Sequence, residues 1–552
     1  MRMNIQVKNG MTQSAFSYEQ AIVEEVYVET MIDSDEDGKN DRIYVEVIRP
    51  QETVEGYKVP VIYNMSPYNG GLDYPEYFDV DEELYGGAPT YTKEGHYDKY
   101  FVERGYAVVN ANSIGSKGSD GCPTTGDKYE ILAAKAVVDW LNHRAQAFNS
   151  KGEQVIANWT TGSVGMIGLS YEGTIANGVA TTGVDGLKTI VPIGSISNWY
   201  DYYRANGAVI APGGYQGDDA DRLARGVLTR ENPDICHCLI DKIEEDQDRI
   251  TGNYNDFWDA RNYINDAKNI KASVLVVHGL NDMNVKRKQF AEWWEVLKQY
   301  DVPRKLWLHQ GGHIDPKKAD EDKWLTTINK WFDYWLYDID NGIMDEPKVD
   351  IEKIDHTWEQ LQEWPHQDVE TKQLFLRKGQ DGIGGLSLYS QEDYDVSFVD
   401  APLKQATELI KSPSTSSAHR VAFLSPILQE SIRLSGTPHL TIHASFDHTA
   451  ANLSALLVDY GPDGETIVTR GWMDPRNGDS LRESRPLVPH QSYELTWPLE
   501  PHDYTFAAGH RLGLVILSTD YEYTKRPKTI VSVTVSLKDS YLTLPLVGMF
   551  PK

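Results

Sequence analysis

The chain has 552 residues, and its 82 acidic against 53 basic side chains give a formal net charge of −29. Hydrophobic residues make up 40% and aromatic residues 11% of the sequence, a composition that excludes disorder over most of the length. The negative charge argues against nucleic acid as a partner, because phosphate binding requires clustered Lys and Arg, and the lack of any apolar run near 18 residues argues against a membrane span.

The first structured segment alternates apolar and polar side chains over residues 23–50, interrupted by a stretch rich in Asp. This pattern predicts two antiparallel strands joined by a turn. Asp33, Asp35 and Asp37 resemble the start of a calcium loop, but position twelve of that loop would be Tyr44, where such a site needs a bidentate Glu. We therefore favour a hairpin turn there and assign no metal ligands, while whether this turn binds a cation stays open.

Short apolar runs then alternate with amphipathic helical stretches at residues 129–145 and 287–300. Continuous apolar strands separated by such helices predict a parallel sheet covered on both faces, within a domain spanning residues 1–350. The alternation breaks at about residues 200–269, which predict a mainly helical insertion over the carboxyl edge of the sheet. The apolar runs lie at residues 59–65, 105–112, 164–170, 188–194, 272–279 and 304–310.

Short strands with turn signals recur over residues 351–552, where long helical patterns are absent. Regular spacing of this kind favours a C-terminal β-sandwich. The fold class expected for the whole chain is therefore α/β, with a helical insertion and a second, all-β domain.

Three cysteines occur, Cys122, Cys236 and Cys238. Three cannot pair fully, and the last two lie too close in sequence for easy bridging. A reducing compartment is the simplest account, and the N-terminal residues show no apolar leader, so we expect a cytoplasmic protein.

The strongest local signal is the sequence VGMIGLSYEGTIANG, in which an apolar strand meets Ser170 and a helical stretch begins at once. Such a strand–turn–helix junction holds a serine hydroxyl exposed above a sheet. The familiar G-x-S-x-G form is only partly matched, because Glu172 occupies the second glycine position and Gly173 follows one residue later.

A serine hydroxyl needs a base, and the base needs an orienting acid. Asp282 follows the strand at residues 272–279, and His313 follows the next strand in a glycine-rich loop. The order Ser, Asp, His at successive strand ends predicts a triad of Ser170, Asp282 and His313. His278 and His309 compete for the role of base, but both lie within strands and are expected to be packed.

The oxyanion of a tetrahedral intermediate needs hydrogen-bond donors. We expect one from the backbone N–H of Tyr171, the residue after the serine. Tyr68, in the loop after the strand at residues 59–65, is the candidate for a second donor.

The run from Gly168 to Asp219, together with HGLNDMNV and QGGHI, resembles the Xaa-Pro dipeptidyl-peptidases. These serine peptidases are related to cocaine esterase and the α-amino-ester hydrolases. The resemblance implies an α/β-hydrolase core, a helical cap, a C-terminal jelly roll and no cofactor. It also implies release of N-terminal dipeptides whose second residue is proline, less readily alanine, from peptides with a free N-terminus.

In that family the serine of G-x-S-Y-x-G is the nucleophile, which is Ser170 here and places the second glycine at Gly173. The matching aspartate, histidine and oxyanion donors are Asp282, His313, Tyr68 and Tyr171. The residues that match the proline pocket and the amine-binding group are Trp199, Tyr202, Tyr215, Asp218 and Asn284.

Two positions depart from the family pattern: Asp218 stands where glutamate is usual, and Tyr215 where phenylalanine is common. The chain also lacks the long N-terminal helical domain that contributes to dimer contacts in larger members, so a homodimer stays an open expectation.

The proposed specificity also has a direct physical basis. Aromatic faces such as those of Trp199 and Tyr202 stack on the rigid proline ring at little entropic cost. The substrate ammonium needs a desolvated carboxylate, which either Asp218 or Asp219 supplies. Because the amine is bound two residues from the scissile bond, the released product is limited to a dipeptide.

Two alternatives stay open at this point. The first is an esterase or α-amino-acid ester hydrolase (acylase) of the same fold, which shares the triad and differs in the amine pocket. The second is a carbohydrate- or partner-binding protein that uses its sandwich and has lost catalysis.

Overall fold

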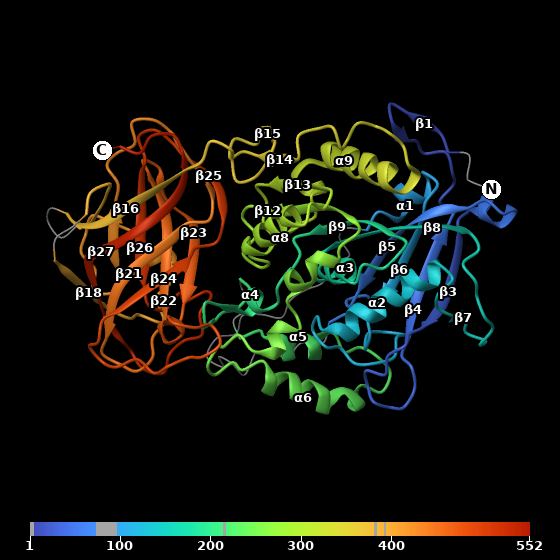
Figure 1. The fold of residues 1–552 in the computed structure, drawn as a ribbon, viewed down its shortest axis with the longest axis horizontal. Helices are drawn as coiled ribbons and strands as arrows, with labels where there is room; N and C mark the ends of the chain where they lie inside the picture. The colour runs from blue at the N-terminus through green and yellow to red at the C-terminus, as the bar shows by residue number, and fades with distance from the viewer. Residues whose placement is uncertain (1–4, 73–95, 214–216, 380–383, 391–392, 552) are drawn as a thin grey trace.

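A computed structural model describes residues 5–72, 96–213, 217–379, 384–390 and 393–551. Figure 1 shows an α/β domain built from the N-terminal part of the chain and, at the other end of the long axis, an all-β domain formed by the C-terminal part. Among the described residues, no helix combines the length and the apolar character that a membrane crossing requires.

The described part of the first domain contains an eleven-stranded sheet. Its centre, from β13 to β6, is parallel, as the continuous apolar runs predict. In spatial order the strands are β15 (Trp358–Leu361), β14 (Val349–Glu352), β13 (Arg304–His309), β12 (Ser273–Gly279), β9 (Leu187–Ile193), β8 (Thr160–Leu169), β5 (Val59–Ser66), β6 (Ala107–Asn112), β4 (Arg42–Arg49), β3 (Ile22–Glu29) and β7 (Ala147–Phe148).

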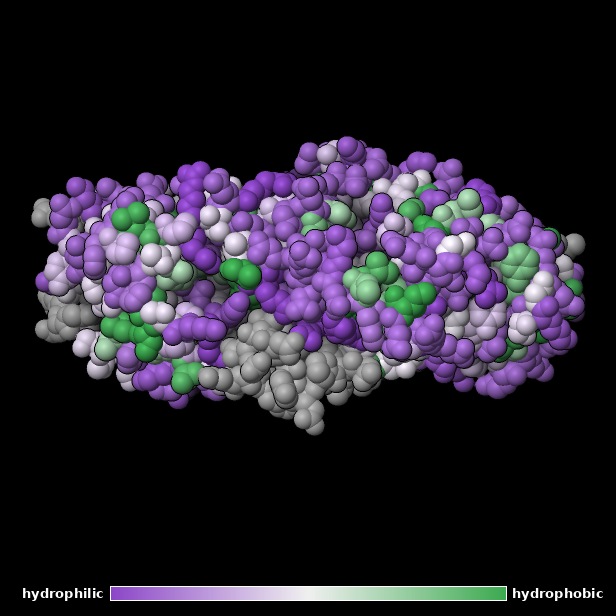
Figure 2. All heavy atoms as spheres, turned by 90° about the horizontal axis from the view of Figure 1, so that it is seen from below, coloured by the Kyte–Doolittle hydropathy of each residue, from purple (hydrophilic) through white to green (hydrophobic). Residues whose placement is uncertain are grey.

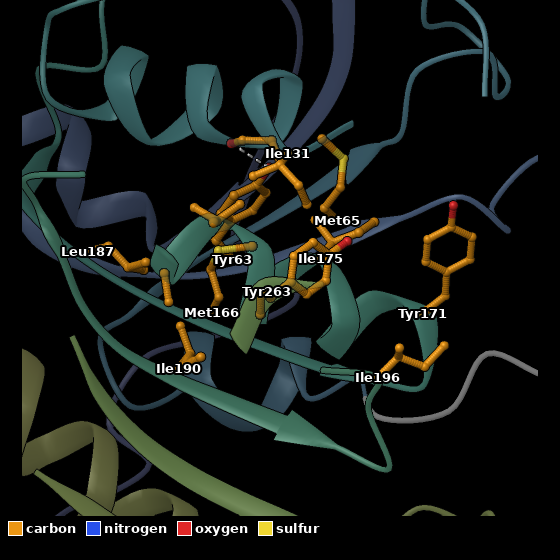
Figure 3. Packing of buried hydrophobic residues seen from close by; sticks show 14 of the residues in the cluster. Tyr63, Met65, Ile131, Met166, Tyr171, Ile175, Leu187, Ile190, Ile196 and Tyr263 are labelled. Atoms are coloured by element: carbon orange, nitrogen blue, oxygen red, sulfur yellow. Dashed lines mark hydrogen bonds between the residues drawn. The ribbon is translucent and has the colours of Figure 1, made fainter. Parts of the chain in front are cut away.

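Helices cover both faces of this sheet, because successive side chains of its central strands point to opposite sides. Tyr63 and Met65 belong to the core cluster that includes α2 and α3, whereas Ile62 belongs to the cluster that includes α1 and α9. Figure 3 shows part of the first cluster. The helices are α1 (Asp98–Val102), α2 (Lys128–Leu141), α3 (Tyr171–Thr181), α8 (Lys288–Gln299) and α9 (Lys317–Tyr337).

The predicted antiparallel pair is present as β3 and β4. In the turn between them, Asp33 accepts the backbone N–H groups of Asp37 and Gly38, and Asp35 accepts a hydrogen bond from Arg230 at 2.6 Å. These bonds explain the three clustered carboxylates as parts of a turn. Among the described residues, this is also the one group of acidic, His or Cys side chains close enough to share a metal ion.

The insertion between β9 and β12 is mainly helical, as predicted, and forms a cap. A short antiparallel pair, β10 and β11, follows its first helix, and Ile210, the residue after β11, forms a bridge with Thr524 of the C-terminal domain. Its elements are α4 (Tyr200–Tyr203), β10 (Arg204–Ala205), β11 (Ala208–Val209), α5 (Ala220–Val227), η2 (Pro233–Cys236), α6 (His237–Asp246), α7 (Asp256–Asp259) and η3 (Tyr263–Asn269).

A disulfide between Cys122 and Cys236 joins the cap to the loop after β6, and Cys238 is free and exposed. Because the two bonded residues are 114 positions apart, their pairing has no local signal in the sequence. The cysteines therefore do not support the expectation of a reducing compartment.

Removing this disulfide is expected to lower the free energy of unfolding by about 2–4 kcal/mol, because the cross-link closes a long loop in the unfolded chain. Urea unfolding of a double variant, Cys122→Ala with Cys236→Ala, measures the loss. Cys238→Ala is the matched control and should unfold at the wild-type midpoint. Equal wild-type midpoints with and without a dithiol reductant would contradict the prediction.

The C-terminal domain is built mainly of β-strands, with only the short helices α10 (Ala406–Leu409) and η5 (Pro475–Asn477) in its described part. Twelve strands pair there into one continuous network. The long strand β27 pairs with β16, β18, β20 and β21 and so connects the layers of the sandwich. The strands are β16 (Glu370–Lys378), β17 (Gly384–Ser387), β18 (Asp395–Val399), β19 (Val421–Leu424), β20 (Ile432–Gly436), β21 (His439–Phe446), β22 (Leu453–Gly461), β23 (Gly464–Met473), β24 (Tyr493–Pro498), β25 (His502–Phe506), β26 (Arg511–Leu517) and β27 (Ser532–Val547).

The domain boundary at residues 350–351 stays a prediction. It falls inside β14, which pairs with β13 and so extends the sheet of the first domain.

The surface view in Figure 2 is mostly hydrophilic, with small, separate hydrophobic groups, in keeping with the net charge of −29.

Candidate active site

Neighbouring parallel strands end together at the carboxyl edge of the sheet. The register pairs Leu169 of β8 with Ile193 of β9, and Gly279 of β12 with His309 of β13. This is the edge where open α/β sheets bind their ligands. The predicted triad follows three of these strand ends: Ser170 directly after β8, Asp282 in the loop after β12, and His313 in the loop after β13.

Ser170 occupies a strained turn between β8 and α3. Its φ of 62° and ψ of −125° lie in a region that non-glycine residues rarely adopt. The turn is held by two backbone bonds: Ser170 N–H donates to Ile193 O at 2.8 Å, and Thr174 N–H donates to Ser170 O at 2.9 Å. The serine is therefore fixed between the neighbouring strand and the first turn of the helix.

The glycine spacing around Ser170 follows from close backbone approach. A methyl group added at Gly168 would lie 2.5 Å from Glu172 Cβ. One added at Gly173 would lie 2.4 Å from Gly168 O and 2.1 Å from Ser195 Oγ. The second glycine is thus required three residues after the serine, and position 172 can carry a buried Glu.

Asp282 and His313 form a hydrogen-bonded pair, with Asp282 Oδ2 2.7 Å from His313 Nδ1. The other carboxylate oxygen accepts the N–H groups of Asn284 and Val285, each at 3.0 Å. Burial acts to raise the pKa of Asp282, but the adjacent imidazole and the Asn284 N–H outweigh it and hold this pKa below its usual value. An ionised Asp282 therefore fixes the orientation of the imidazole.

Gly194 connects this pair to the serine turn. A methyl group there would lie 3.3 Å from both His313 Nδ1 and Asp282 Oδ2. The preceding residue, Ile193, accepts the Ser170 N–H. The serine backbone and the His–Asp pair thus contact consecutive residues at the end of β9.

The competing histidines are buried within their strands, as the sequence predicts. His278 Nε2 lies 2.8 Å from Val285 O, and His309 Nδ1 accepts the Gly311 N–H. Burial lowers the pKa of His309 to about 4. Both rings serve the packing of the edge loops.

The two oxyanion candidates lie side by side. Tyr171 is the first residue of α3, and its ring meets that of Tyr68 edge to face at a centroid distance of 6.0 Å. Tyr68 is half-buried in the loop after β5, where its N–H donates to Ser66 Oγ. Their joint action on an oxyanion stays a prediction.

Glu130 is a site residue that sequence analysis missed. Its buried carboxylate accepts the Tyr171 hydroxyl at 2.7 Å and the N–H groups of Thr124, Thr125 and Gly126 at 2.9–3.0 Å. It therefore ties the start of α3 to the loop before α2. The signal available in the sequence was one acidic residue on the apolar face of a predicted helix.

Aromatic rings continue from Tyr171 into the cap. Trp199 lies edge to face with Tyr171 and with Tyr202, at centroid distances of 4.9 and 5.9 Å. Trp199 is fully buried and donates to the Tyr263 hydroxyl, so its direct contact with a substrate stays a prediction. The Tyr202 hydroxyl donates to Asn284 Oδ1 at 2.7 Å, which links the cap to the loop that carries Asp282.

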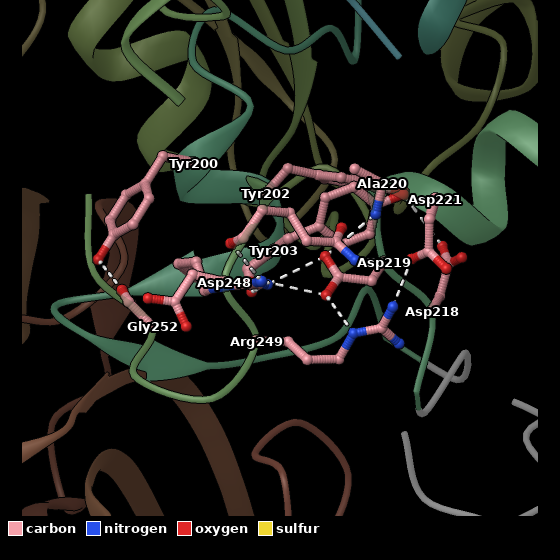
Figure 4. A network of polar contacts seen from close by, with 12 residues as sticks. Tyr200, Tyr202, Tyr203, Asp218, Asp219, Ala220, Asp221, Asp248, Arg249 and Gly252 are labelled. Carbon is pink, nitrogen blue, oxygen red and sulfur yellow. Dashed lines mark hydrogen bonds and ion pairs between the residues drawn. The ribbon is translucent and has the colours of Figure 1, made fainter. Parts of the chain in front are cut away.

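The structure distinguishes the two adjacent aspartates at the start of α5. Asp219 forms a two-point ion pair with Arg204 at 3.0 and 3.1 Å, and both side chains are fully buried. Asp219 also caps the helix by accepting the Ala220 N–H and lies near Arg249 (Figure 4). It is therefore neutralised within the cap.

No ion pair of this kind joins Asp218 to a cation in the part of the chain that the structure describes. Asp218 is 6% exposed, its Oδ2 accepts a bond of 3.3 Å from the Tyr203 hydroxyl, and its Oδ1 has no hydrogen-bond partner among the described residues. Burial and the adjacent Asp219 raise the pKa of Asp218 well above its usual value. Tyr215, predicted beside it, lies outside the described residues.

A parallel sheet with this serine turn and a His–Asp pair at its carboxyl edge defines an α/β-hydrolase. Solved structures share the fold: an α-amino acid ester hydrolase (TM-score 0.69, 18% identity, 99% of this chain and 100% of that one) and a CocE/NonD family hydrolase from Staphylococcus aureus (TM-score 0.70, 16% identity, 99% of each chain). At these identities the likeness concerns the fold alone.

Sequence comparison gives the family. The family model for X-Pro dipeptidyl-peptidase (S15 family) matches residues 37–315, and that for the X-Pro dipeptidyl-peptidase C-terminal non-catalytic domain matches residues 341–545. The chain belongs to this serine-peptidase family. It is 52% identical to a putative Xaa-Pro dipeptidyl-peptidase of Bacillus anthracis over 99% of this chain and 91% of the relative. It is 31% identical to the Xaa-Pro dipeptidyl-peptidase of Pediococcus pentosaceus, over 98% of this chain and 79% of the relative.

Proposed function

We propose that the protein is a serine exopeptidase that releases N-terminal Xaa-Pro dipeptides, and less readily Xaa-Ala dipeptides, through an acyl-enzyme. Family membership supports the reaction. The observation that carries the specificity is the buried Asp218 carboxylate. One of its oxygens has no hydrogen-bond partner among the described residues, and the carboxylate lies beside Tyr203 in the ring cluster that reaches Tyr171.

In the first half of the proposed reaction, Ser170 Oγ attacks the carbonyl carbon of the substrate's second residue and His313 Nε2 takes the hydroxyl proton. Asp282 stabilises the imidazolium. The Tyr171 N–H and the Tyr68 hydroxyl donate to the oxyanion, and loss of one such donor typically costs about 10²–10³ in rate. His313 then protonates the leaving amine as the peptide bond breaks, which leaves the dipeptide as an ester on Ser170.

In the second half, His313 takes a proton from a water molecule as the water attacks the ester carbonyl. Collapse of the second tetrahedral intermediate returns that proton to Ser170 Oγ and releases the dipeptide. The chain's own side chains therefore supply every proton transfer in this scheme.

Substrate length follows from the distance between two fixed points. Asp218 binds the free ammonium, while Ser170 attacks the carbonyl of the second residue. Tyr202 and Trp199 are proposed to face the proline ring, and Asn284 to bind the substrate next to Tyr202. Asp218 is one methylene shorter than the usual glutamate, which alters reach and so the preferred first residue.

Asp218 should also make substrate affinity depend on pH. Its raised pKa means that the carboxyl group ionises at a higher pH than an exposed aspartate does. Because only the ionised form attracts an ammonium group, KM for free-amine dipeptidyl substrates should rise as the pH falls through this pKa. Initial rates at several substrate concentrations between about pH 4 and about pH 8 give this dependence of KM on pH. KM for an uncharged acyl ester should show no such rise, and the same rise for both substrates would contradict the assignment.

Hydrolysis of Ala-Pro-p-nitroanilide tests the proposed function against the alternative ester hydrolase. We expect the enzyme to cleave the free-amine anilide and to reject its N-acetylated form. A kcat/KM for simple or α-amino acyl esters that exceeds the anilide value by orders of magnitude would favour the alternative. A wild-type protein that a fluorophosphonate does not label would instead favour a binding protein without catalysis.

Three expectations from the sequence stay predictions: a cytoplasmic location, assembly into homodimers and a jelly-roll strand order in the C-terminal domain. The absence of a cofactor also stays an expectation, since the proposed scheme needs none.

A further inference from the structure

Three basic residues follow the Asp282 loop in sequence, and the fold buries them. Lys286 and Arg287 are fully buried, and Lys288 is partly buried. A buried cation loses much hydration free energy, so it must be compensated by close partners. Because the chain has a net charge of −29 and these three cations are buried or partly buried, we interpret them as contacts between parts of the structure and not as a solvated surface.

All three contact the C-terminal domain, and the two lysines also contact the cap. Arg287 donates to Leu280 O within its own loop and to Thr469 Oγ1 in β23 of the C-terminal domain. The Lys288 side chain donates to Asp201 in α4, and its backbone N–H donates to Glu500 of the C-terminal domain.

Lys286 makes the central link. Its ammonium donates to the backbone carbonyl groups of Tyr202 and Ala211, at 3.4 and 3.2 Å. It also lies over the Tyr202 and Trp472 rings, 5.7 and 5.9 Å from their centroids. Burial lowers the pKa of Lys286 to about 8, against the attraction of Glu500 and other nearby carboxylates.

The segment that Lys286 holds leads to the proposed amine anchor. Ala211 lies between β11 and Asp218, and its N–H donates to Tyr523 O of the C-terminal domain at 2.9 Å. One residue earlier, Ile210 forms an antiparallel bridge with Thr524. The C-terminal domain therefore backs this segment on one side while Lys286 ties it to the catalytic loop.

We propose that Lys286 is a positioning residue for substrate specificity, through which the catalytic loop, the cap and the C-terminal domain hold Asp218 and Tyr202 at a set distance from Asp282 and His313. This rests on the proposed dipeptidyl-peptidase function. It gives the C-terminal domain a role in the active site through Trp472 and Tyr523, although it supplies no group to the chemistry.

The test replaces Lys286 with methionine, which keeps the aliphatic stem and removes the ammonium. The readout is the kcat/KM for Ala-Pro-p-nitroanilide divided by that for p-nitrophenyl acetate, which needs neither the amine anchor nor the proline pocket. Lys286→Met should lower this ratio about tenfold or more, mainly through KM, because the anchor would no longer be held at the required distance.

Lys305→Met is the matched control. Lys305 is also a buried lysine whose ammonium donates to backbone carbonyl groups, those of Ile343 and Pro347, but it lies near the amino end of β13. Its variant should lose comparable stability and leave the ratio within about twofold of wild type. Equal ratios in both lysine variants would overturn the positioning role.

Two further outcomes separate the claims. A wild-type enzyme inactive on the anilide overturns the proposed function and this inference with it, whereas an active wild type with an unchanged ratio in Lys286→Met overturns the inference alone. If Lys286→Met does not fold, the ratio of anilide to ester kcat/KM is measured for Trp472→Phe instead. A fall of about threefold supports the role, and an unchanged ratio overturns it.

Discussion

Replacing Ser170 with alanine is expected to lower kcat by about four orders of magnitude or more, because the hydroxyl is the atom that bonds to the substrate in the proposed scheme. The fold should be retained. The strained turn is held by backbone bonds to Ile193 and Thr174, and none of these uses the serine side chain. Steady-state kinetics on Ala-Pro-p-nitroanilide measure the loss, and thermal unfolding measures the stability.

Labelling by a fluorophosphonate provides the control for this prediction. Ser195 lies just past the neighbouring strand end, where its hydroxyl donates to Ile193 O. Ser195→Ala should keep the label and Ser170→Ala should lose it. Retained labelling of the Ser170 variant, or activity near the wild-type value, would remove Ser170 as the nucleophile.

Replacing Asp218 with asparagine is expected to lower kcat/KM for free-amine dipeptidyl substrates by about 30-fold to 5,000-fold. Leaving one member of a buried charge pair without its partner costs about 2–5 kcal/mol, which corresponds to this range. The same variant should hydrolyse p-nitrophenyl acetate at close to the wild-type rate, because that ester carries no ammonium group. Kinetics on the two substrates measure the difference.

Asp333→Asn controls for the loss of a buried carboxylate away from the site. Asp333 is fully buried on α9, where it accepts hydrogen bonds from Thr12 and Tyr106. This variant should lose stability without a change in the ratio of anilide to ester hydrolysis. If N-acetylated and free-amine substrates respond equally to Asp218→Asn, the carboxylate is not the amine anchor.

The candidate triad could be predicted from the sequence because each of its members follows an apolar strand. The strands at residues 160–169, 273–279 and 304–309 contain the apolar runs at residues 164–169, 274–277 and 306–308, and parallel strands end at one edge. The placement of Ser170, Asp282 and His313 at that edge therefore follows from local signals. The family motifs added the candidate substrate-binding positions, which periodicity alone does not reveal.

Other features had no such signal. Glu130 supports Tyr171 from 41 positions away, and Cys122 pairs with Cys236 across 114 positions. Local patterns report which face of an element is apolar. They do not report which distant polar groups that face meets.

The sequence by itself determined the α/β class, the helical insertion, the all-β domain and the family, because these depend on apolar periodicity and on short motifs. Only the tertiary structure distinguished the charge environments of the two adjacent aspartates. Arg204 and Arg249 reach Asp219, whereas none of the cations among the described residues forms an ion pair with Asp218. The physical reason is that a buried carboxylate is defined by the charges packed around it, and those come from segments that only folding brings together.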